Sequence, residues 1–466
     1  MKTKYILFFS FWLALFVVSC NRDDISFDSP SQKLKFSQDT LVLDTVYNQV
    51  RSETYAVKIY NTENKDITIP RIYLEGGAAS PYRINVDGKP GTEFTNVPLR
   101  KKDSLYVFVE IAPQANATEA IAEDRVQIET PAAKQHFTLL SVIQDAEFYV
   151  STSTNPQIIN QNTVWNSNKA KIIYGDLKVA DGKSLTLSEG TKVYFHRDAN
   201  LKIGKNAQLI ANGNLGKEVI FRGDRNDARY DTLPKNWGGI QLEQGATAQL
   251  NYAKIFGGTN ALYLNQASAS LKNTMIHTNQ EFGIMGIQAT VNAENLVMNN
   301  CGQACIGIFK GGNYNILHST IANYWNLNGA LPGYGIYATN EYVNGTTTEL
   351  GALNFNLKNS IVYSDKSTAI LLKPISGQTF TYLIENSLLK YSSQNAGFNF
   401  DGNSSVVNSI QNQDPKFENY FTQKLNLRVK ADSPAKGKGK VSTAALVPLD
   451  VVKVNRTTSP TIGAYQ

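Results

Sequence analysis

Short runs that alternate apolar and polar residues fill the first part of the chain. Residues 33–146 contain seven such runs, among them "SETYAVKIYNT", "SLYVFVEIAP" and "HFTLLSVIQ", with Gly, Asn, Asp and Pro between them. Alternation with a period of two is typical of strands that bury one face. The pattern therefore predicts a β-sandwich over residues 33–146, which we expect to act as a spacer or packing domain.

From about residue 150 the apolar positions become regularly spaced. Leu177, Leu185, Val193, Leu201 and Leu209 follow one another at intervals of eight residues, with turn residues such as "SEG" and "RDAN" between the runs. Strands this short, with turns this regular, indicate a chain that winds in coils of three strands each. Internal repeats of this kind are typical of solenoid proteins.

Further along, the repeat becomes a full coil. The segments "LNYAKI", "LKNTMI", "AENLVM", "ILHSTI", "LKNSIV" and "IENSLL" align at intervals near 22 residues, which lengthen where insertions enter. Their last positions are Ile255, Ile276, Met298, Ile321, Val362 and Leu389. A coil of this length buries its inward side chains only against the coils above and below it. We expect a solenoid over residues 150–430, with residues 431–466 as its C-terminal extension or cap.

The third position of the aligned segments is mostly asparagine. It reads Tyr252, Asn273, Asn295, His318, Asn359 and Asn386. Stacked asparagines at a turn can hydrogen-bond one another along the solenoid axis and so satisfy amide and backbone groups together. We interpret His318 as a substituted rung of this ladder and not as a catalytic histidine.

The start of the chain has the pattern of a bacterial lipoprotein. Two lysines precede an apolar run over residues 5–18, which spans roughly 21 Å as a helix and is shorter than the ~30 Å core of a membrane. "VVSC" at its end resembles a lipobox, which implies a signal peptide over residues 1–19 and lipidation, including palmitate, at Cys20. The polar residues 20–32 then predict a flexible lipidated tether.

Composition excludes some function classes. The net charge is +6, but lysine and arginine are scattered, so no nucleic-acid partner is expected. Attraction to an acidic polysaccharide stays open. Three cysteines are few for an exported chain of 466 residues, so stability must come from burial. The 23 tyrosines favour β-structure and suit surfaces that face carbohydrate.

The coils, "NWGGIQL" at 236–242 and the ending "RTTSPTIGAYQ" resemble the right-handed parallel β-helix proteins of the pectin-lyase-like superfamily. More narrowly, they resemble surface lipoproteins of the Bacteroidota, and "AVKIYNTENKDITIPRIYLEGG" resembles an immunoglobulin-like domain. The resemblance implies an all-β chain with an immunoglobulin-like sandwich followed by a right-handed β-helix. It also implies a bacterial outer-membrane protein, lipid-anchored and exposed at the cell surface.

The fold hosts polysaccharide lyases, glycoside hydrolases and inert adhesins, so it does not by itself assign an activity. Carboxylates are sparse along the repeats, and no catalytic motif of the family is found, so no catalytic residue is assigned. We expect a non-catalytic glycan-binding or structural, adhesive protein. The alternative is a polysaccharide lyase or glycoside hydrolase.

The densest charged stretch is "FRGDRNDARYDTLPKNW" at 221–237. Asp224, Asp227 and Asp231 could converge on a calcium ion, but three arginines in the same stretch oppose a cation. We favour a structural loop of salt bridges, with calcium as the alternative. No other metal or cofactor is expected.

An insertion after the "ILHSTI" segment is rich in aromatic residues. Tyr324, Trp325, Tyr334, Tyr337 and Tyr342 lie there among Asn and Gly. Flat rings stack on sugar faces and amides bind hydroxyls, so these residues form a candidate glycan-binding edge, led by Trp325 and Tyr334. The alternative is that the rings cover the side of the solenoid.

The pair Cys301 and Cys305 in "CGQAC" has no histidine or further cysteine nearby in sequence, so a zinc site is not expected. The two residues form either one short disulfide or a pair of small buried side chains.

Overall fold

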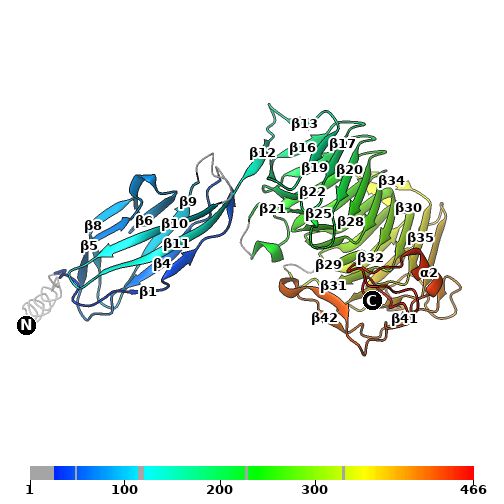
Figure 1. Ribbon diagram of the computed structural model, residues 1–466. Coiled ribbons are helices and arrows are strands. Elements are labelled where there is room, and N and C mark those ends of the chain that lie inside the picture. Colours follow the sequence, from blue (N-terminus) through cyan, green and yellow to red (C-terminus); the bar gives the residue numbers. More distant parts are fainter. Residues whose placement is uncertain (1–25, 48–49, 114–119, 226–228, 328–330) are drawn as a thin grey trace, which may run out of the picture. The chain divides into compact units, whose positions relative to one another are not determined.

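A computed structural model describes residues 26–47, 50–113, 120–225, 229–327 and 331–466. The chain divides into two compact units, Met1–Asp145 and Ala146–Gln466 (Figure 1). The proposed lipidation site, Cys20, the signal peptide and the start of the tether lie outside the described residues. Among the residues described, no helix is long and apolar enough to cross a membrane.

The first unit consists of two sheets that share one hydrophobic core. One sheet has the order β1 (Lys35–Phe36), β4 (Tyr55–Tyr60), β9 (Ser104–Ile111), β6 (Tyr82–Val86), β7 (Lys89–Gly91). The other has the order β2 (Thr40–Val42), β11 (Lys134–Gln144), β10 (Ala120–Glu129), β5 (Ile67–Leu74), β8 (Glu93–Leu99), with β3 (Val46–Tyr47) beside β11. A 3₁₀ turn, η1 (Gly77–Ala79), precedes β6. Alternate residues of strands such as β9 point into the core, as the period of two predicts.

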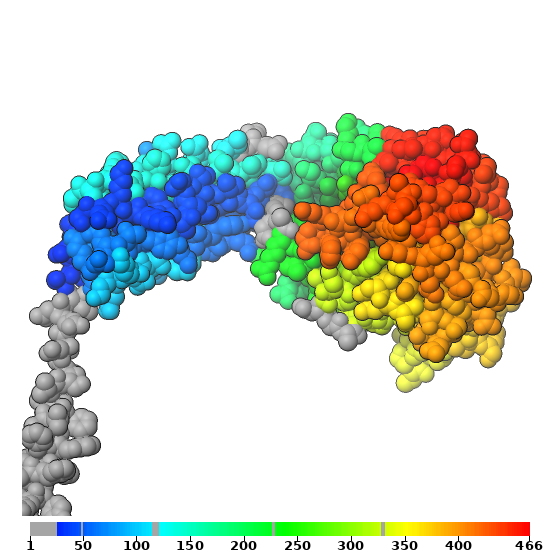
Figure 2. Space-filling view, turned by 90° about the horizontal axis from the view of Figure 1, so that it is seen from below, coloured from blue at the N-terminus to red at the C-terminus, as the bar shows by residue number. Residues whose placement is uncertain are grey.

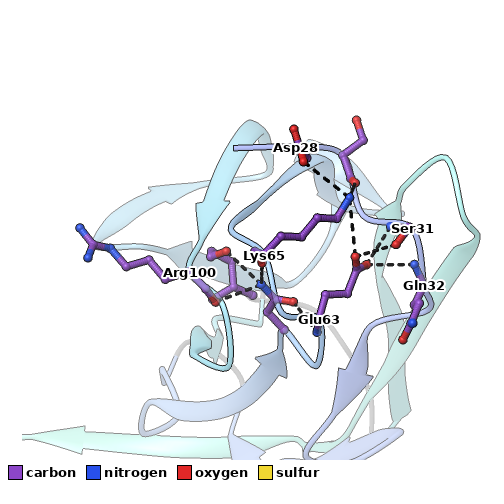
Figure 3. Close-up of polar contacts among 9 residues, drawn as sticks. Asp28, Ser31, Gln32, Glu63, Lys65 and Arg100 are labelled. Carbon is purple, nitrogen blue, oxygen red and sulfur yellow. Dashed lines mark hydrogen bonds and ion pairs between the residues drawn. The ribbon is translucent and has the colours of Figure 1, made fainter. Parts of the chain in front are cut away.

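The residues that enter the first unit are fixed to it by Glu63. Its carboxylate accepts hydrogen bonds from the backbone N–H of Ser31 and Gln32, at 2.7 and 3.0 Å (Figure 3). It also accepts the hydroxyl of Ser31 at 2.6 Å. Asp28 forms an isolated parallel bridge with Ile67. Part of the segment expected to act as a tether is therefore held against the sandwich from Asp28 onward.

The second unit is a β-helix-like solenoid of parallel strands. In the described residues, one of its sheets has 11 strands. They are β12 (Ala146–Val150), β15 (Ala170–Tyr174), β18 (Lys192–Phe195), β21 (Val219–Gly223), β24 (Ala253–Phe256), β27 (Met275–Asn279), β29 (Val297–Cys301), β31 (Thr320–Asn323), β36 (Ile361–Ser364), β39 (Leu388–Leu389) and β41 (Ile410–Gln411).

The remaining parallel strands form two faces that β28 and β30 join into one sheet. One face contains β13 (Gln157–Ile159), β16 (Asp176–Val179), β19 (Asn200–Ile203), β22 (Trp237–Leu242), β25 (Gly258–Asn265), β28 (Phe282–Glu294), β30 (Ala304–Leu317), β32 (Tyr334–Thr339) and β37 (Ile370–Lys373). The other continues through β28 and β30 and adds β14 (Thr163–Trp165), β17 (Ser184–Leu187), β20 (Gln208–Asn212), β23 (Thr247–Asn251), β26 (Ser268–Lys272), β35 (Leu353–Lys358), β38 (Phe380–Glu385) and β40 (Val406–Val407).

The register of the coils confirms the sequence alignment. Ile255 pairs with Ile276, Ile276 with Met298, and Met298 with Ile321. The column continues through Val362 and Leu389. The side chains of this column are fully buried in the solenoid core. The 22-residue repeat therefore identifies the inward positions correctly.

The predicted ladder is present over part of the solenoid. Asn273 Nδ2 donates to Asn251 Oδ1 at 3.0 Å, and Asn295 Nδ2 donates to Asn273 Oδ1 at 2.8 Å. Asn359 Nδ2 and His318 Nε2 lie 2.9 Å apart. All six aligned positions have a φ between +46° and +53°. Asparagine tolerates this left-handed conformation better than most residues, which explains its recurrence at the turn.

Burial of His318 predicts an acid-sensitive step in stability. Burial, with a smaller contribution from the charge of Arg456, lowers the pKa of His318 to about 3. An unfolded histidine takes up its proton near pH 6.5. The stabilisation is therefore present above pH 6.5 and is lost as the pH falls toward 3, by up to about 1.4 kcal/mol per pH unit. The melting temperature of His318→Asn should fall less between pH 7 and pH 4 than that of the wild type. An equal fall in the two proteins would contradict this.

Residues 412–466 return along the outside of the 11-stranded sheet, and we call them the C-terminal strap. The strap contains the hairpin β42 (Phe417–Asn419) and β43 (Asn426–Val429), the turn η3 (Thr422–Lys424) and the helix α2 (Val441–Leu446). Figure 2 shows the strap in orange to red across one face of the solenoid. Its apolar side chains, including Leu427 and Ile462, pack on outward residues of the sheet such as Ile361 and Leu388.

Candidate functional site

Five aromatic rings gather on the outer face of β28, β30 and β32 and on the antiparallel hairpin β33 (Glu341–Asn344) and β34 (Thr347–Leu350). We call them the ring cluster: Phe282, Phe309, Tyr334, Tyr337 and Tyr342. Phe309 is central, with ring centroids 5.7 Å from Phe282, 5.5 Å from Tyr337 and 6.3 Å from Tyr342. Tyr334 and Tyr337 lie 6.1 Å apart. All five are half-buried, so each ring retains surface that solvent can reach.

The packing of the ring cluster depends on Gly307. A Cβ atom at this position would lie 2.6 Å from Phe282 Cε1 and 3.1 Å from Phe309 Cε2. Gly307 also pairs in register with Tyr337 on β32. Because Gly307 has no side chain, aromatic rings from the neighbouring strands can pack over its backbone.

A polar hollow of about 410 Å³ lies on the same outer face, across β19, β22 and β25. We call it the polar cradle. Its lining consists of one carboxylate, three amides, a threonine, a tyrosine and two glycines: Asp198, Asn200, Gln241, Asn260, Thr259, Tyr263, Gly238 and Gly239. Asn260 Oδ1 accepts the backbone N–H of Phe282 at 3.1 Å. The cradle and the ring cluster are therefore neighbours on one surface.

Glycine and a β-bulge give the cradle its shape. A Cβ atom at Gly238 would lie 2.0 Å from Asn200 Oδ1, and one at Gly239 would lie 1.9 Å from Asn260 O. The register between β22 and β25 shifts between Gly239 and Ile240. Such bulges redirect side chains and are common beside functional sites. Gly238 thus leaves room for the amide of Asn200, and Gly239 leaves room for the backbone of Asn260.

The amide of Asn200 is held in one orientation. Its Nδ2 donates to Asp176 Oδ1 at 2.8 Å and to the carbonyl of Asp198 at 3.0 Å. Its Oδ1 accepts Gln241 Nε2 at 3.1 Å. A fixed amide needs no ordering when a ligand binds, which favours affinity. The cradle therefore presents a preorganised polar floor.

The ionisable groups around the cradle are mostly paired. Lys202 Nζ lies 2.6 Å from Asp176, and Lys178 Nζ lies 3.1 Å from Asp181. Burial raises the pKa of Asp176, but the ion pair with Lys202 and the amide of Asn200 outweigh this and lower it. Burial, with the neighbouring Tyr342, raises the pKa of Tyr263. At neutral pH this tyrosine therefore keeps its proton and can donate a hydrogen bond.

The structure separates the five aromatic residues singled out in the insertion. Tyr334, Tyr337 and Tyr342 belong to the ring cluster. Tyr324 stacks on Tyr420 of the strap, with ring centroids 4.1 Å apart. Trp325 is 4% exposed, so its ring is not presented to a polymer at the surface. The insertion thus supplies three rings to the ring cluster, while its other two aromatic residues, Tyr324 and Trp325, are packing residues.

The charged stretch at 221–237 makes an ion pair and a histidine–carboxylate contact where it is described. Arg222 Nη1 lies 2.6 Å from Asp231, and His196 Nδ1 lies 2.8 Å from Asp224. Burial raises the pKa of Asp224, and the contact with His196 opposes that effect. Asp227 lies outside the described residues. Within the part of the chain that is described, no three His, Cys, Asp or Glu side chains are placed to hold a metal ion.

Cys301 and Cys305 are free thiols in this structure, and both are fully buried in the solenoid core. Burial, together with the neighbouring Cys301, raises the pKa of the Cys305 thiol well above its usual range. A buried protonated thiol is inert. Of the two alternatives for this pair, the structure has the two small buried side chains.

Several residues of the outer face were not singled out from sequence. Phe282, Phe309 and Tyr263 lie on regular coils, where they look like ordinary strand residues. The signal that could have found the cradle is the glycine pair in "NWGGIQL", because adjacent glycines inside a strand often mark a bulge or a close backbone approach.

Comparisons with known proteins do not assign a family. No family model matches the chain, and no curated protein matches it. Solved structures with some likeness include a family 123 glycoside hydrolase from Clostridium perfringens that acts on glycolipid glycans. It is 12% identical over 26% of this chain and 25% of that chain, with a TM-score of 0.19. A likeness this small supports no statement about fold or function.

Proposed function

We propose that this protein is a lipid-anchored, surface-exposed glycan-binding protein of the outer membrane, which holds an extended polysaccharide without cleaving it. In this proposal the sandwich is an immunoglobulin-like spacer and the solenoid a right-handed, pectin-lyase-like β-helix. The observation that carries the proposal is the continuity of the polar cradle with the ring cluster. Together they run from β19 to β32, across five strand steps, or about 24 Å.

The chemistry of this surface suits a sugar polymer. A half-buried ring offers an apolar face for the C–H face of a sugar, and amides both donate to and accept from hydroxyl groups. The parallel strands repeat both kinds of group along one line. A flexible polymer laid along that line would meet a rigid scaffold, so binding would order the polymer alone.

Asp176, the carboxylate that holds the amide of Asn200, is not in the state that the acid of a hydrolase needs. A glycosidase needs one carboxylic acid with a raised pKa to protonate the leaving group. Asp176 is ion-paired with Lys202, and its pKa is lowered. Incubation of the protein with neutral and acidic polysaccharides separates binding from cleavage by a lyase or hydrolase. Retention without new reducing ends or unsaturated products supports binding, and either product would overturn it.

Replacing Tyr334 and Tyr337 by alanine should weaken polysaccharide retention by about tenfold or more, because two half-buried rings of one cluster are removed. Affinity electrophoresis in gels that contain the bound polysaccharide measures the change. Tyr420→Ala, which removes a ring 39% exposed on the strap, is the matched control. Equal retention of the two variants per folded molecule would place the binding surface elsewhere.

The anchor has its own test. The membrane fraction should yield an N-terminal peptide that begins at Cys20 and carries acyl chains, seen by mass spectrometry. The motive is "VVSC" behind an apolar run, and two or three acyl chains give a stable anchor where one gives a marginal one. A Cys20→Ala protein that stays in the membrane fraction would contradict the proposal.

A further inference from the structure

We infer that the polar cradle is a subsite for an uncharged sugar, so that the polysaccharide bound by this protein is neutral and not a polymer of uronic acids. This inference rests on the proposed function and adds the class of the ligand. It follows from which charges face the cradle and which are already paired.

The charges at the cradle oppose an acidic sugar. Asp198 is the one charged residue among those that line it. Glu281 is on its rim, where its Oε2 accepts Asn260 Nδ2 at 3.2 Å. A carboxylate on the ligand would be placed beside these two negative groups, and like charges at short range disfavour binding.

The nearby cations do not offset this. Lys202 is the register neighbour of Gln241, and its Nζ is held 2.6 Å from Asp176. Lys178 is shared between Asp181 and Glu243, at 3.1 and 3.9 Å. Arg197 lies 3.6 Å from Asp198, but both side chains are more than 70% exposed. An exposed ion pair of this kind is weak, so Arg197 offsets little of the negative charge of Asp198.

The remaining groups match hydroxyls. Asn200, Gln241 and Asn260 bring amides to one hollow, and Asp198 adds a carboxylate acceptor. Carboxylates accept hydrogen bonds from hydroxyl groups strongly. Tyr263 supplies a ring at the side that leads to the ring cluster. A neutral pyranose can use its hydroxyls and its apolar face here at the same time.

Titration calorimetry of the full-length protein with neutral oligosaccharides (cello-, manno- and xylo-oligomers) and with oligogalacturonate and alginate oligomers tests the inference. We expect at least one neutral series to bind tenfold or more tightly than both acidic ones. Gln241→Ala should weaken that binding about tenfold, because it removes one cradle amide and the donor to Asn200 Oδ1. Gln244→Ala, which removes an exposed amide paired with Gln266 at 3.2 Å, is the matched control and should bind as the wild type.

Asp198→Asn separates charge from shape. It keeps the backbone carbonyl that holds Asn200 and removes the carboxylate, so the gap between neutral and acidic oligomers should narrow several-fold. Tighter binding of the acidic series by the wild type would overturn the inference while leaving glycan binding intact. So would neutral binding that Gln241→Ala leaves unchanged. If neither series binds at millimolar concentration, the proposed function fails as well.

Discussion

Ile276→Asp should destabilise the solenoid by about 4 kcal/mol or more, because it puts a carboxyl group in a core without hydrogen-bond partners. Ile276 is fully buried between Ile255 and Met298 of the adjacent coils. Each coil buries its inward residues only against its neighbours, so a defect in one coil weakens the stack on both sides. Thermal unfolding followed by circular dichroism should show a large drop in the melting temperature.

The control for this change is Lys272→Gln, four positions earlier in the same repeat. The side chain of Lys272 is 52% exposed and its Nζ lies 3.2 Å from Glu294. Loss of an exposed ion pair changes stability by ~1 kcal/mol or less. Similar melting temperatures for the two variants would refute the assignment of inward and outward positions.

The repeat made most of the solenoid predictable. One column of apolar residues at intervals near 22 fixes which residues point inward, and the strand register agrees with it. The ladder was predictable for a related reason, since a left-handed turn position selects asparagine.

A second ladder, made of serines, was not predicted. The backbone N–H groups of Ser319, Ser360 and Ser387 donate to the hydroxyl groups of Ser360, Ser387 and Ser409 at 3.0 to 3.2 Å. Serine lies one position after the rungs His318, Asn359 and Asn386, but serine is too common at turns for this to stand out.

The candidate site was less predictable, because it depends on neighbours in space from different coils. The insertion drew attention to its own tyrosines, but their partners Phe282 and Phe309 come from regular strands. Trp325 is buried, and its position in an insertion did not indicate this. The cradle depends on a register shift beside Gly239, and a one-residue bulge leaves little trace in a hydrophobic pattern.

The hydrophobic pattern of the sequence also did not predict the path of the C-terminal strap. Some of its contacts join residues more than 100 positions apart, and its apolar residues have no period. Several polar contacts make the connection specific, and Arg456 supplies the most buried of them. Arg456 is 1% exposed, and its Nη2 donates to Asn295 Oδ1 of the ladder at 2.8 Å. The strap is therefore joined to the ladder itself.

Arg456→Met should destabilise the protein by about 3 kcal/mol and loosen the strap, because it leaves several buried acceptors without a donor. Arg456 also donates to the carbonyls of Gly463 and Ala464, at 3.0 and 3.2 Å. Burial lowers the pKa of Arg456 to about 10, and the charge of Asp450 partly opposes this. The guanidinium thus stays charged at neutral pH. Its loss removes the charged donor that these buried acceptors share.

Hydrogen exchange distinguishes this role from a general loss of stability. In Arg456→Met, amides of the last ten residues of the strap should exchange faster, while those of β22 and β25 stay protected. Arg456→Lys should not restore protection, since one ammonium cannot reach the three acceptors that the planar fork serves. Arg428→Met is the matched control, because Arg428 lies 5.0 Å over the ring of Tyr465 and removing it empties no buried site. Equal protection of the strap in Arg456→Met and Arg428→Met would show that apolar packing alone holds it on the sheet.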